Sequence, residues 1–328
     1  MSFSQIIGHQ KQVEIVRQAL NHGRLHHAYL FAGLDGVGKK TIALGLAKAI
    51  HCSGVTDDFC GECTDCARIQ DGNHPDVRIL GPLAGKKEIS IQQIRELEKE
   101  LNFRSFSGKK KIVILDPATL MNLAAQNALL KTLEEPPQES LLILIASNGG
   151  ALLPTLRSRC LRVTFGPLAR DRVSGFLVSR KGVEKEAADF LAVVSMGSLG
   201  AVVNVDPQEL IERRRHWIRL VCSLRAGDYR AATDAAEVLS GSKEDSLRFL
   251  DWVESWFRDL LVYGVTRGAQ DVVNADILSE IQQQSTSTEF ERLFSLIAKA
   301  KEAVEGIQRN LNRRMLLEDL LLNTVEAS

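Results

Sequence analysis

The sequence has no excess of charge of either sign. Lys plus Arg and Asp plus Glu number 41 each, so the formal net charge of the chain is zero. A domain that binds nucleic acid over its own surface commonly has a basic footprint, and a basic footprint over the whole chain is absent here. If this protein works on DNA, we expect it to do so locally or through partner proteins.

Long apolar segments are also missing. No apolar run reaches the length of about 20 residues that a membrane-spanning helix needs. The first residues, Met1–Gln5, lack the basic segment followed by an apolar stretch that is typical of a secretory signal peptide. The sequence also contains no internal repeat and no low-complexity tract. These absences predict a cytoplasmic protein that makes no contact with a membrane.

The chain is long enough for two or three domains, since 328 residues exceed one small hydrophobic core. Its first half alternates between short apolar runs and amphipathic segments. We expect strands at 28–32, 77–80, 111–115, 141–146 and 161–165, and helices at 10–20, 39–51, 91–101 and 122–133. Strands separated by helices predict an α/β domain, with a mostly parallel sheet covered by helices on both faces.

The pattern changes after Gly166-Pro167, beyond which the sequence predicts helices only. Asp206-Pro207 forms a plausible hinge, because proline restricts the preceding residue and stops helices. We therefore predict three domains: an α/β domain at 1–166, a small helical domain at 167–206 and an all-helical domain at 207–328.

A glycine-rich segment, GLDGVGKKT at 33–41, follows a predicted strand and opens a predicted helix. Glycines let backbone N–H groups converge on phosphate oxygens, and the helix N-terminus adds partial positive charge. The candidate phosphate-binding residues are Gly33, Gly36, Gly38 and Lys39. A phosphate loop requires Ser or Thr next, to hold Mg²⁺, but Lys40 stands there and the hydroxyl follows at Thr41. One helical step turns a side chain by about 100°, so Thr41 is not a simple substitute.

The alternative for this segment is a turn that binds nothing, and the sequence leaves open whether ATP or ADP is bound.

A second motif of an active ATPase, an acidic pair at the end of a strand, is also incomplete. Asp116 ends a predicted strand, where an ATPase would place an Asp for Mg²⁺ followed by a Glu for the attacking water. Here Pro117 follows, and proline has no carboxylate. Asp116 could instead only cap the segment that follows it.

Four of the six cysteines lie within one short segment, at Cys52, Cys60, Cys63 and Cys66. Four thiolates at this spacing suit a closed tetrahedral Zn²⁺ site of the structural kind. Two disulfides, unligated thiols and an iron–sulfur cluster are the alternatives, and disulfides are disfavoured in a reducing compartment. Cys160 and Cys222 are isolated, and we interpret them as small buried apolar residues.

Taken in chain order, several segments resemble the clamp-loader family of the AAA+ ATPases. They are IGHQ at 7–10, the loop at 33–39, the four cysteines, Asp116, NALLKTLEEPP at 127–137 and LRSRC at 156–160. The resemblance is specific over about 6–165. It is weaker over the next domain, and in the last domain it consists of helical character and the run NLNRRMLLE at 310–318.

The resemblance implies an AAA+ core with a zinc knuckle inserted after the phosphate-loop helix, then a helical lid and an all-α collar. It also implies that Arg159 is an arginine finger that reaches ATP on a neighbouring subunit. An ordinary surface or ion-paired arginine is the alternative. A motor subunit would have an Arg in the lid, where this chain has Gly200.

Three residues that ATP hydrolysis requires in this family are therefore replaced, by Lys40, Pro117 and Gly200. The arginine finger, Arg159, is retained. This combination implies a stator-type subunit of a hetero-pentameric loader, which acts with motor subunits, a sliding clamp and primer–template DNA. A motor-type ATPase that uses Thr41 is one alternative. A zinc-containing nucleic-acid-binding module is another, and the neutral charge weighs against it. Trp252, Trp256 and Phe257 lie on one predicted helix, and we interpret them as packing rather than base-stacking groups.

Overall fold

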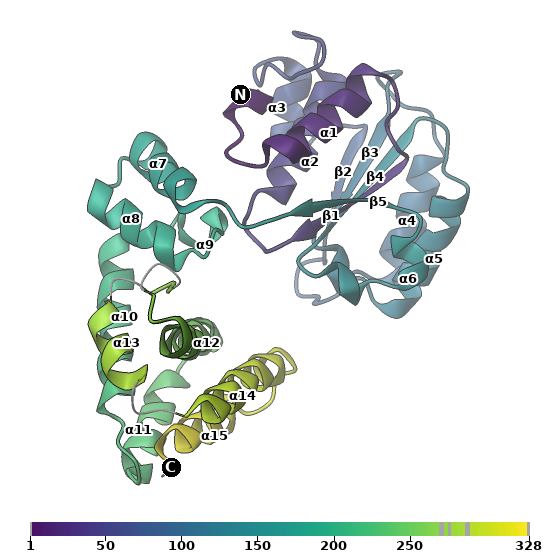
Figure 1. Ribbon diagram of the computed structural model, residues 1–328. Helices are drawn as coiled ribbons and strands as arrows, with labels where there is room; N and C mark the ends of the chain where they lie inside the picture. Colours follow the sequence, from purple (N-terminus) through teal and green to yellow (C-terminus); the bar gives the residue numbers. More distant parts are fainter. Residues whose placement is uncertain (1, 269–271, 275–276, 286–288, 327–328) are drawn as a thin grey trace. The chain divides into compact units, whose positions relative to one another are not determined.

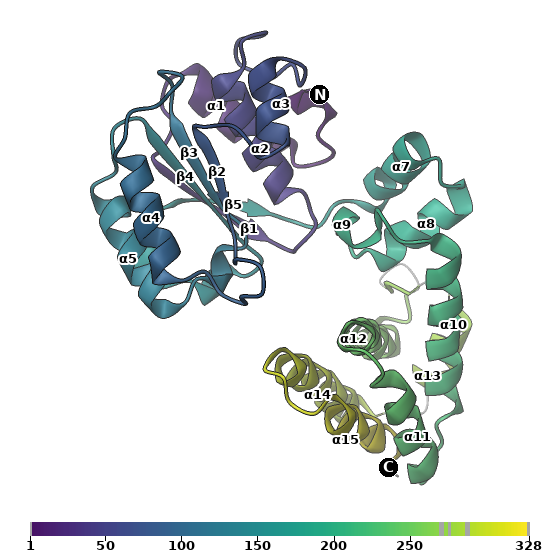
Figure 2. The same ribbon diagram turned by 180° about the vertical axis from the view of Figure 1, so that it is seen from behind.

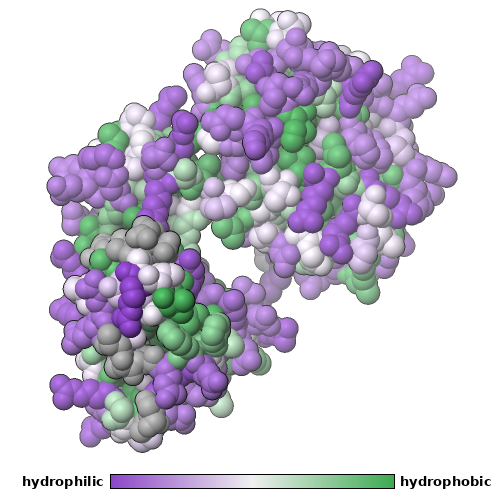
Figure 3. Space-filling model, in the orientation of Figure 1, coloured by the Kyte–Doolittle hydropathy of each residue, from purple (hydrophilic) through white to green (hydrophobic). Residues whose placement is uncertain are grey.

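The computed structural model describes residues 2–268, 272–274, 277–285 and 289–326 (Figure 1). The chain forms two compact units, Met1–Asn204 and Val205–Ser328, which we describe separately. Three short 3-10 helices, Phe3–Gln5, Ala118–Leu120 and Gly149–Ala151, belong to the first unit. Hydrophilic residues cover most of the face in view in Figure 3. Among the described helices, none is long and apolar enough to cross a membrane.

A parallel five-stranded sheet organises the first unit. The strands are β1 (Ala28–Gly33), β2 (Val77–Leu80), β3 (Lys111–Leu115), β4 (Ser140–Ala146) and β5 (Leu161–Phe165). Their order across the sheet is β2-β3-β4-β1-β5, and each neighbouring pair is parallel. The predicted α/β architecture is therefore confirmed, with all five strands at the expected positions.

Helices cover both faces of this sheet (Figures 1 and 2). One layer contains α1 (Gln10–Asn21), α2 (Lys39–His51) and α3 (Thr64–Gln70); the other contains α4 (Ile91–Leu101), α5 (Leu123–Glu134) and α6 (Pro154–Arg157). Alternate residues of a strand point to opposite faces. Accordingly, Tyr29 and Phe31 of β1 join the core with α2, whereas Leu30 joins the core with α4 and α5. Both cores depend on the period-two pattern of the strands.

Three helices complete the first unit after the sheet: α7 (Arg170–Lys181), α8 (Lys185–Val194) and α9 (Leu199–Val202). The connection from β5 is fixed at Leu168, whose N–H donates to the Gly197 carbonyl at 3.0 Å. Gly197 has a φ of 81°, and a Cβ there would lie 2.5 Å from the Pro167 side chain. Only glycine fits this turn, which brings the start of α9 back towards the sheet.

The second unit is helical throughout its described residues. Its helices are α10 (Pro207–Ser223), α11 (Tyr229–Leu239), α12 (Lys243–Thr266), α13 (Leu278–Ser285), α14 (Phe290–Gln308) and α15 (Arg313–Val325). Trp217, Trp252 and Trp256 lie in its core, with successive ring centroids 5.7 and 5.9 Å apart. Trp252, Trp256 and Phe257 are each less than a tenth exposed, so their interpretation as packing groups is confirmed.

A buried carboxylate anchors an irregular segment in this unit. Asp259 of α12 is completely buried, and it accepts hydrogen bonds from the backbone N–H groups of Val273 at 3.0 Å and Asn274 at 2.6 Å. The Asn274 side-chain amide donates to the same carboxylate at 2.6 Å, and Arg258 lies 3.0 Å from it. These donors satisfy a charge that would otherwise be costly to bury.

We predict that Asp259→Ala destabilises the second unit by about 3 kcal/mol, because it leaves several buried donors without an acceptor. Tryptophan fluorescence during urea unfolding measures this directly, since all three tryptophans lie in this unit. Asp234→Ala is the matched control, because Asp234 is 72% exposed and is expected to change stability by less than about 0.5 kcal/mol. Equal midpoints for the two variants would contradict the anchoring role.

Candidate functional site

The glycine-rich loop connects the end of β1 to the start of α2. Gly36 and Gly38 have φ angles of 73° and 111°, which favour glycine, and Gly38 is the N-cap of α2. The loop is held from outside by His9, whose Nε2 lies 2.9 Å from the Val37 carbonyl oxygen. Burial lowers the pKa of His9, so a neutral imidazole makes this bond at pH 7. The loop therefore joins a strand to a helix N-terminus through glycines in left-handed conformations, which is compatible with the predicted phosphate loop.

Lys39 is folded back onto this loop. Its side chain is only 4% exposed, and Nζ donates to the Gly33 and Leu34 carbonyl oxygens, the latter at 2.7 Å. The Asp35 carboxylate is 3.4 Å away and is itself largely exposed. The ammonium group is therefore held beside the glycine loop, where it can reach a phosphate only by exchanging these carbonyl partners.

Lys40 points to the second acidic position. Its Nζ lies 3.2 Å from Oδ2 of Asp116, which directly follows β3. Thr41, the displaced hydroxyl, is exposed. The structure thus brings Asp116 to the loop predicted from sequence, but a lysine ammonium group lies against its carboxylate.

The loop is also bonded to the start of α9. Ser198 Oγ donates to the Asp35 carbonyl at 2.7 Å, and the Gly200 N–H donates to the Gly36 carbonyl at 2.9 Å. A Cβ on Gly200 would lie 2.7 Å from the Gly36 Cα. A side chain at position 200 therefore has no room in this arrangement, which gives a steric reason for glycine where a motor subunit would have arginine.

Arg159 lies at the amino ends of the parallel strands, whereas the glycine-rich loop lies at their carboxyl ends. It precedes β5, and Leu161 at the start of β5 pairs in parallel with Tyr29, whereas Phe165 pairs with Gly33. Four strand residues span about 13 Å, so the two ends of the sheet are well separated. Arg159 donates to the Thr155 carbonyl at 2.8 Å and pairs with Glu134 at 2.6 Å, with its side chain 35% exposed. The structure does not bring Arg159 together with the loop of its own chain.

The four cysteines of the predicted knuckle come together between α2 and α3. Cys52 caps the end of α2, Cys63 caps the start of α3, and Cys66 lies in the first turn of α3. The four Sγ atoms all lie within 4.8 Å of one another, and all are free thiols. The N–H of Cys60 donates to Cys52 Sγ at 3.4 Å, and that of Cys63 to Cys60 Sγ at 3.3 Å.

The electrostatics favour thiolates at Cys63 and Cys52 but not at Cys66, because burial raises the pKa of the Cys66 thiol to about 12. Burial opposes ionisation of Cys63, but hydrogen bonds from the Ser53 and Cys66 groups outweigh it and lower the pKa of Cys63 to about 5. Hydrogen bonds also lower the pKa of Cys52, again against burial. A thiolate is the form that binds metal. The donor set, the closeness of the sulfur atoms and these N–H···S bonds fit a bound metal ion.

A buried polar cluster next to the knuckle was not predicted. His51, His74 and Asp76 are each at most 5% exposed, and they have potential ligand atoms within 4.8 Å of one another. The Asp76 carboxylate accepts hydrogen bonds from the Ser105 hydroxyl at 3.0 Å and from the N–H groups of residues 106 and 107. Asp76 therefore fixes the segment between α4 and β3. The sequence did not indicate this set, because His51 lies in α2 whereas His74 and Asp76 lie in the segment before β2.

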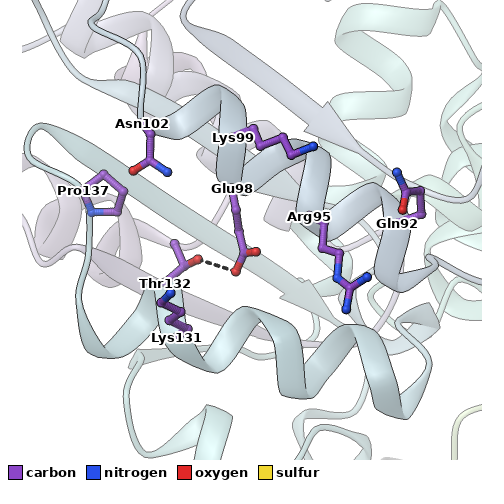
Figure 4. A pocket seen from close by; sticks show the side chains of 8 residues that line it. All are labelled: Gln92, Arg95, Glu98, Lys99, Asn102, Lys131, Thr132 and Pro137. Atoms are coloured by element: carbon purple, nitrogen blue, oxygen red, sulfur yellow. Dashed lines mark hydrogen bonds between the residues drawn. The ribbon is translucent and has the colours of Figure 1, made fainter.

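A polar pocket of about 430 Å³ lies between α4 and α5 (Figure 4). It is lined by Gln92, Arg95, Glu98, Lys99, Asn102, Lys131, Thr132 and Pro137. The Thr132 hydroxyl donates to Glu98 Oε1 at 2.9 Å. None of the site residues identified from the sequence lines this pocket.

Fold and site together define the class of this protein: an α/β core of the AAA+ type with a glycine-rich strand-to-helix loop, a cysteine cluster and following helices. The family model described as "DNA polymerase III, delta subunit" matches residues 8–169, and its C-terminal counterpart matches 202–326. DNA polymerase III subunit delta' of Pseudomonas aeruginosa is 32% identical, covering 90% of each chain. The same subunit of Bacillus subtilis is 30% identical, covering 94% of each. The chain belongs to the DNA polymerase III subunit delta' family.

Relatives named as gamma and tau subunits are similar over a smaller share of their length. DNA polymerase III subunit tau of Escherichia coli is 28% identical over 250 residues, covering 74% of this chain and 36% of the relative. The delta' relatives therefore match along 90 and 94% of their length, and the tau relative along 36%.

For the cysteine cluster we predict about one bound metal ion per chain in the purified protein, and none after the double substitution Cys60→Ser and Cys63→Ser. Atomic spectroscopy after gel filtration gives the metal content. Cys222→Ser is the control, since Cys222 lies in the second unit, outside the cluster. Equal metal content in all three proteins would rule out a metal site made by these thiols.

Proposed function

We propose that this chain is the stator-type delta' subunit of the bacterial DNA polymerase III clamp loader. In this role it helps to load the sliding clamp onto primed DNA during replication, and it does not hydrolyse ATP itself. Membership of the delta' family supports the proposal. The single observation that carries it is the position of Arg159, at the edge of the sheet opposite the phosphate loop of its own chain.

Arg159 acts, in this proposal, as an arginine finger on ATP held by a neighbouring motor subunit. A guanidinium group is always charged and has five N–H donors, so it can stabilise the charge on a transferring phosphoryl group. The Thr155 carbonyl fixes one end of the group, and Glu134 neutralises the other. Exchange of Glu134 for a terminal phosphate would preserve the charge pairing, and the partly exposed side chain makes that exchange accessible.

The chain's own loop is a degenerate nucleotide site formed by Gly33, Gly36, Gly38, Lys39 and Asp116. Pro117 supplies no carboxylate to orient a water molecule, and Lys40 supplies no hydroxyl for Mg²⁺. Binding of ATP or ADP without hydrolysis is compatible with the loop. Catalysis is therefore assigned to the neighbour's site, which this chain completes.

The domain roles follow from this assignment. Residues 1–166 serve as the AAA+ core, 167–206 as the lid and 207–328 as the collar that holds the subunits together. The partners are gamma/tau-type motor subunits and a delta subunit in a hetero-pentamer, with the sliding clamp and primer–template DNA bound through the complex. Relatives named as gamma and tau subunits support the motor partners. This assembly acts in the cytoplasm.

The metal proposed for the cysteine cluster is zinc. Four thiols without a fifth ligand suit a closed tetrahedral site, and Zn²⁺ is the ion that such structural sites commonly hold. Cys52, Cys60, Cys63 and Cys66 would bind it as thiolates, joining the end of α2 to α3. Zinc supplies folding energy to this knuckle and takes no part in phosphoryl transfer.

A gamma/tau-type motor subunit is the second candidate function. The Gly33–Lys39 loop and the similarity to tau favour it. It requires that Thr41 supply a Mg²⁺ ligand, and this side chain is exposed one helical step beyond the required position. Robust ATP turnover by the purified chain, with primed DNA and clamp, would favour the motor over the stator.

We predict that Arg159→Ala leaves the chain folded but lowers ATP turnover at the adjoining motor site of the reconstituted loader by about 10³-fold or more. The physical reason is the loss of a charge that stabilises the transition state. Turnover is measured with clamp and primed DNA present.

Two variants sharpen this test. Arg159→Lys keeps the charge but loses the fork geometry, so we expect only partial recovery. Arg162→Ala removes an exposed arginine of β5 and should leave turnover unchanged. If Arg159→Ala and Arg162→Ala behave alike, the finger assignment is wrong.

A further inference from the structure

The position after Lys39 decides whether a phosphate loop can hold a metal ion. In an active loop a hydroxyl there and the Asp at the end of a nearby strand share one Mg²⁺. In this chain the same two positions are Lys40 and Asp116, and their side chains meet directly, with Nζ and Oδ2 3.2 Å apart. The cation that neutralises Asp116 is therefore part of the chain.

The residues present do not fit Mg²⁺. This ion requires six oxygen ligands in near-octahedral geometry at about 2.1 Å. Lys40 supplies a positive donor instead of an oxygen, Pro117 supplies no carboxylate, and Thr41 is an exposed residue one helical step further along α2. Asp116 alone remains as a ligand, and the Lys40 ammonium group already lies against it.

The surrounding charges oppose a divalent ion as well. Lys39 and Lys40 bring two ammonium groups to the first turn of α2, where the helix dipole adds further positive charge. The carboxylates beside them are Asp116, which is 20% exposed, and Asp35, which is 82% exposed. An incoming Mg²⁺ would have to displace Lys40 from Asp116 and then remain next to it.

We propose that the Lys40 ammonium group replaces the divalent cation of this site, so that the loop does not respond to Mg²⁺. The proposal rests on the proposed function only in taking 33–39 as a phosphate loop. It assigns Lys40 a specific role: a single positive charge, fixed to α2, pairs with the end of β3 in place of an exchangeable ion.

A fixed cation has a consequence for the lid contacts. The loop carbonyls of Asp35 and Gly36 accept hydrogen bonds from Ser198 and Gly200 at the start of α9. If Lys40 always neutralises Asp116, binding of a metal ion cannot switch the loop and these contacts to another conformation. Insensitivity to Mg²⁺ is thus a property expected of a subunit that stays in one conformation.

Calorimetric titration of the full-length chain with ADP, in excess Mg²⁺ and separately in EDTA, tests the role of Lys40. We expect the wild-type chain to give the same result in both solutions, whether it binds ADP equally in both or in neither. Lys40→Thr restores a hydroxyl at the metal position while Asp116 remains. We expect it to bind ADP at least about tenfold more tightly with Mg²⁺ than with EDTA.

The matched control is Lys86→Thr, which changes an exposed lysine in the segment between β2 and α4 and should behave as wild type. Lys40→Ser supplies the same hydroxyl if Lys40→Thr proves unstable by circular dichroism. The proposal is overturned if Mg²⁺ strengthens ADP binding to the wild-type chain, or if neither hydroxyl variant gains dependence on Mg²⁺. Neither outcome affects the role of Arg159 at the other edge of the sheet, so failure here is distinguishable from failure of the stator function.

Discussion

The parallel pairing of β1 with β5 is the constraint on which the functional interpretation depends. Both strands run in the same direction, so the segment that follows β1 and the segment that precedes β5 must lie at opposite edges of the sheet. The phosphate loop occupies the first position and Arg159 the second. In the proposed function, Arg159 therefore acts on a nucleotide held by a neighbouring subunit and not on the loop of its own chain.

The two edges of the sheet have different chemical roles. At one edge Arg159 donates to the Thr155 carbonyl and pairs with the exposed Glu134, and in the proposed function an incoming phosphate replaces that glutamate. At the other edge the charges are internally matched, because Lys39 is held by loop carbonyls and Lys40 by Asp116. We therefore propose that the first site acts on a neighbouring subunit, whereas the second keeps one conformation.

The fold was predictable from sequence because its signals are local. Alternating apolar runs located all five strands, and the spacing of Cys60, Cys63 and Cys66 located the knuckle before any coordinates. The contacts between distant residues were not predictable. Sequence reasoning noted Lys40 as a missing hydroxyl and Gly200 as a missing arginine. It gave no indication that Lys40 meets Asp116 or that Gly200 packs on Gly36, because both contacts depend on how separate elements fold together. The His51, His74 and Asp76 cluster went unnoticed for the same reason.

The most direct measurement is a structure of the reconstituted loader with a non-hydrolysable ATP analogue. The account predicts that the Arg159 guanidinium group lies within hydrogen-bond distance, about 3 Å, of the terminal phosphate held by the adjoining motor subunit. It also predicts that the pair between Arg159 and Glu134 is broken in that state. An Arg159 still paired with Glu134 and remote from the nucleotide, with an ATP analogue and Mg²⁺ in this chain's own loop, would contradict the account.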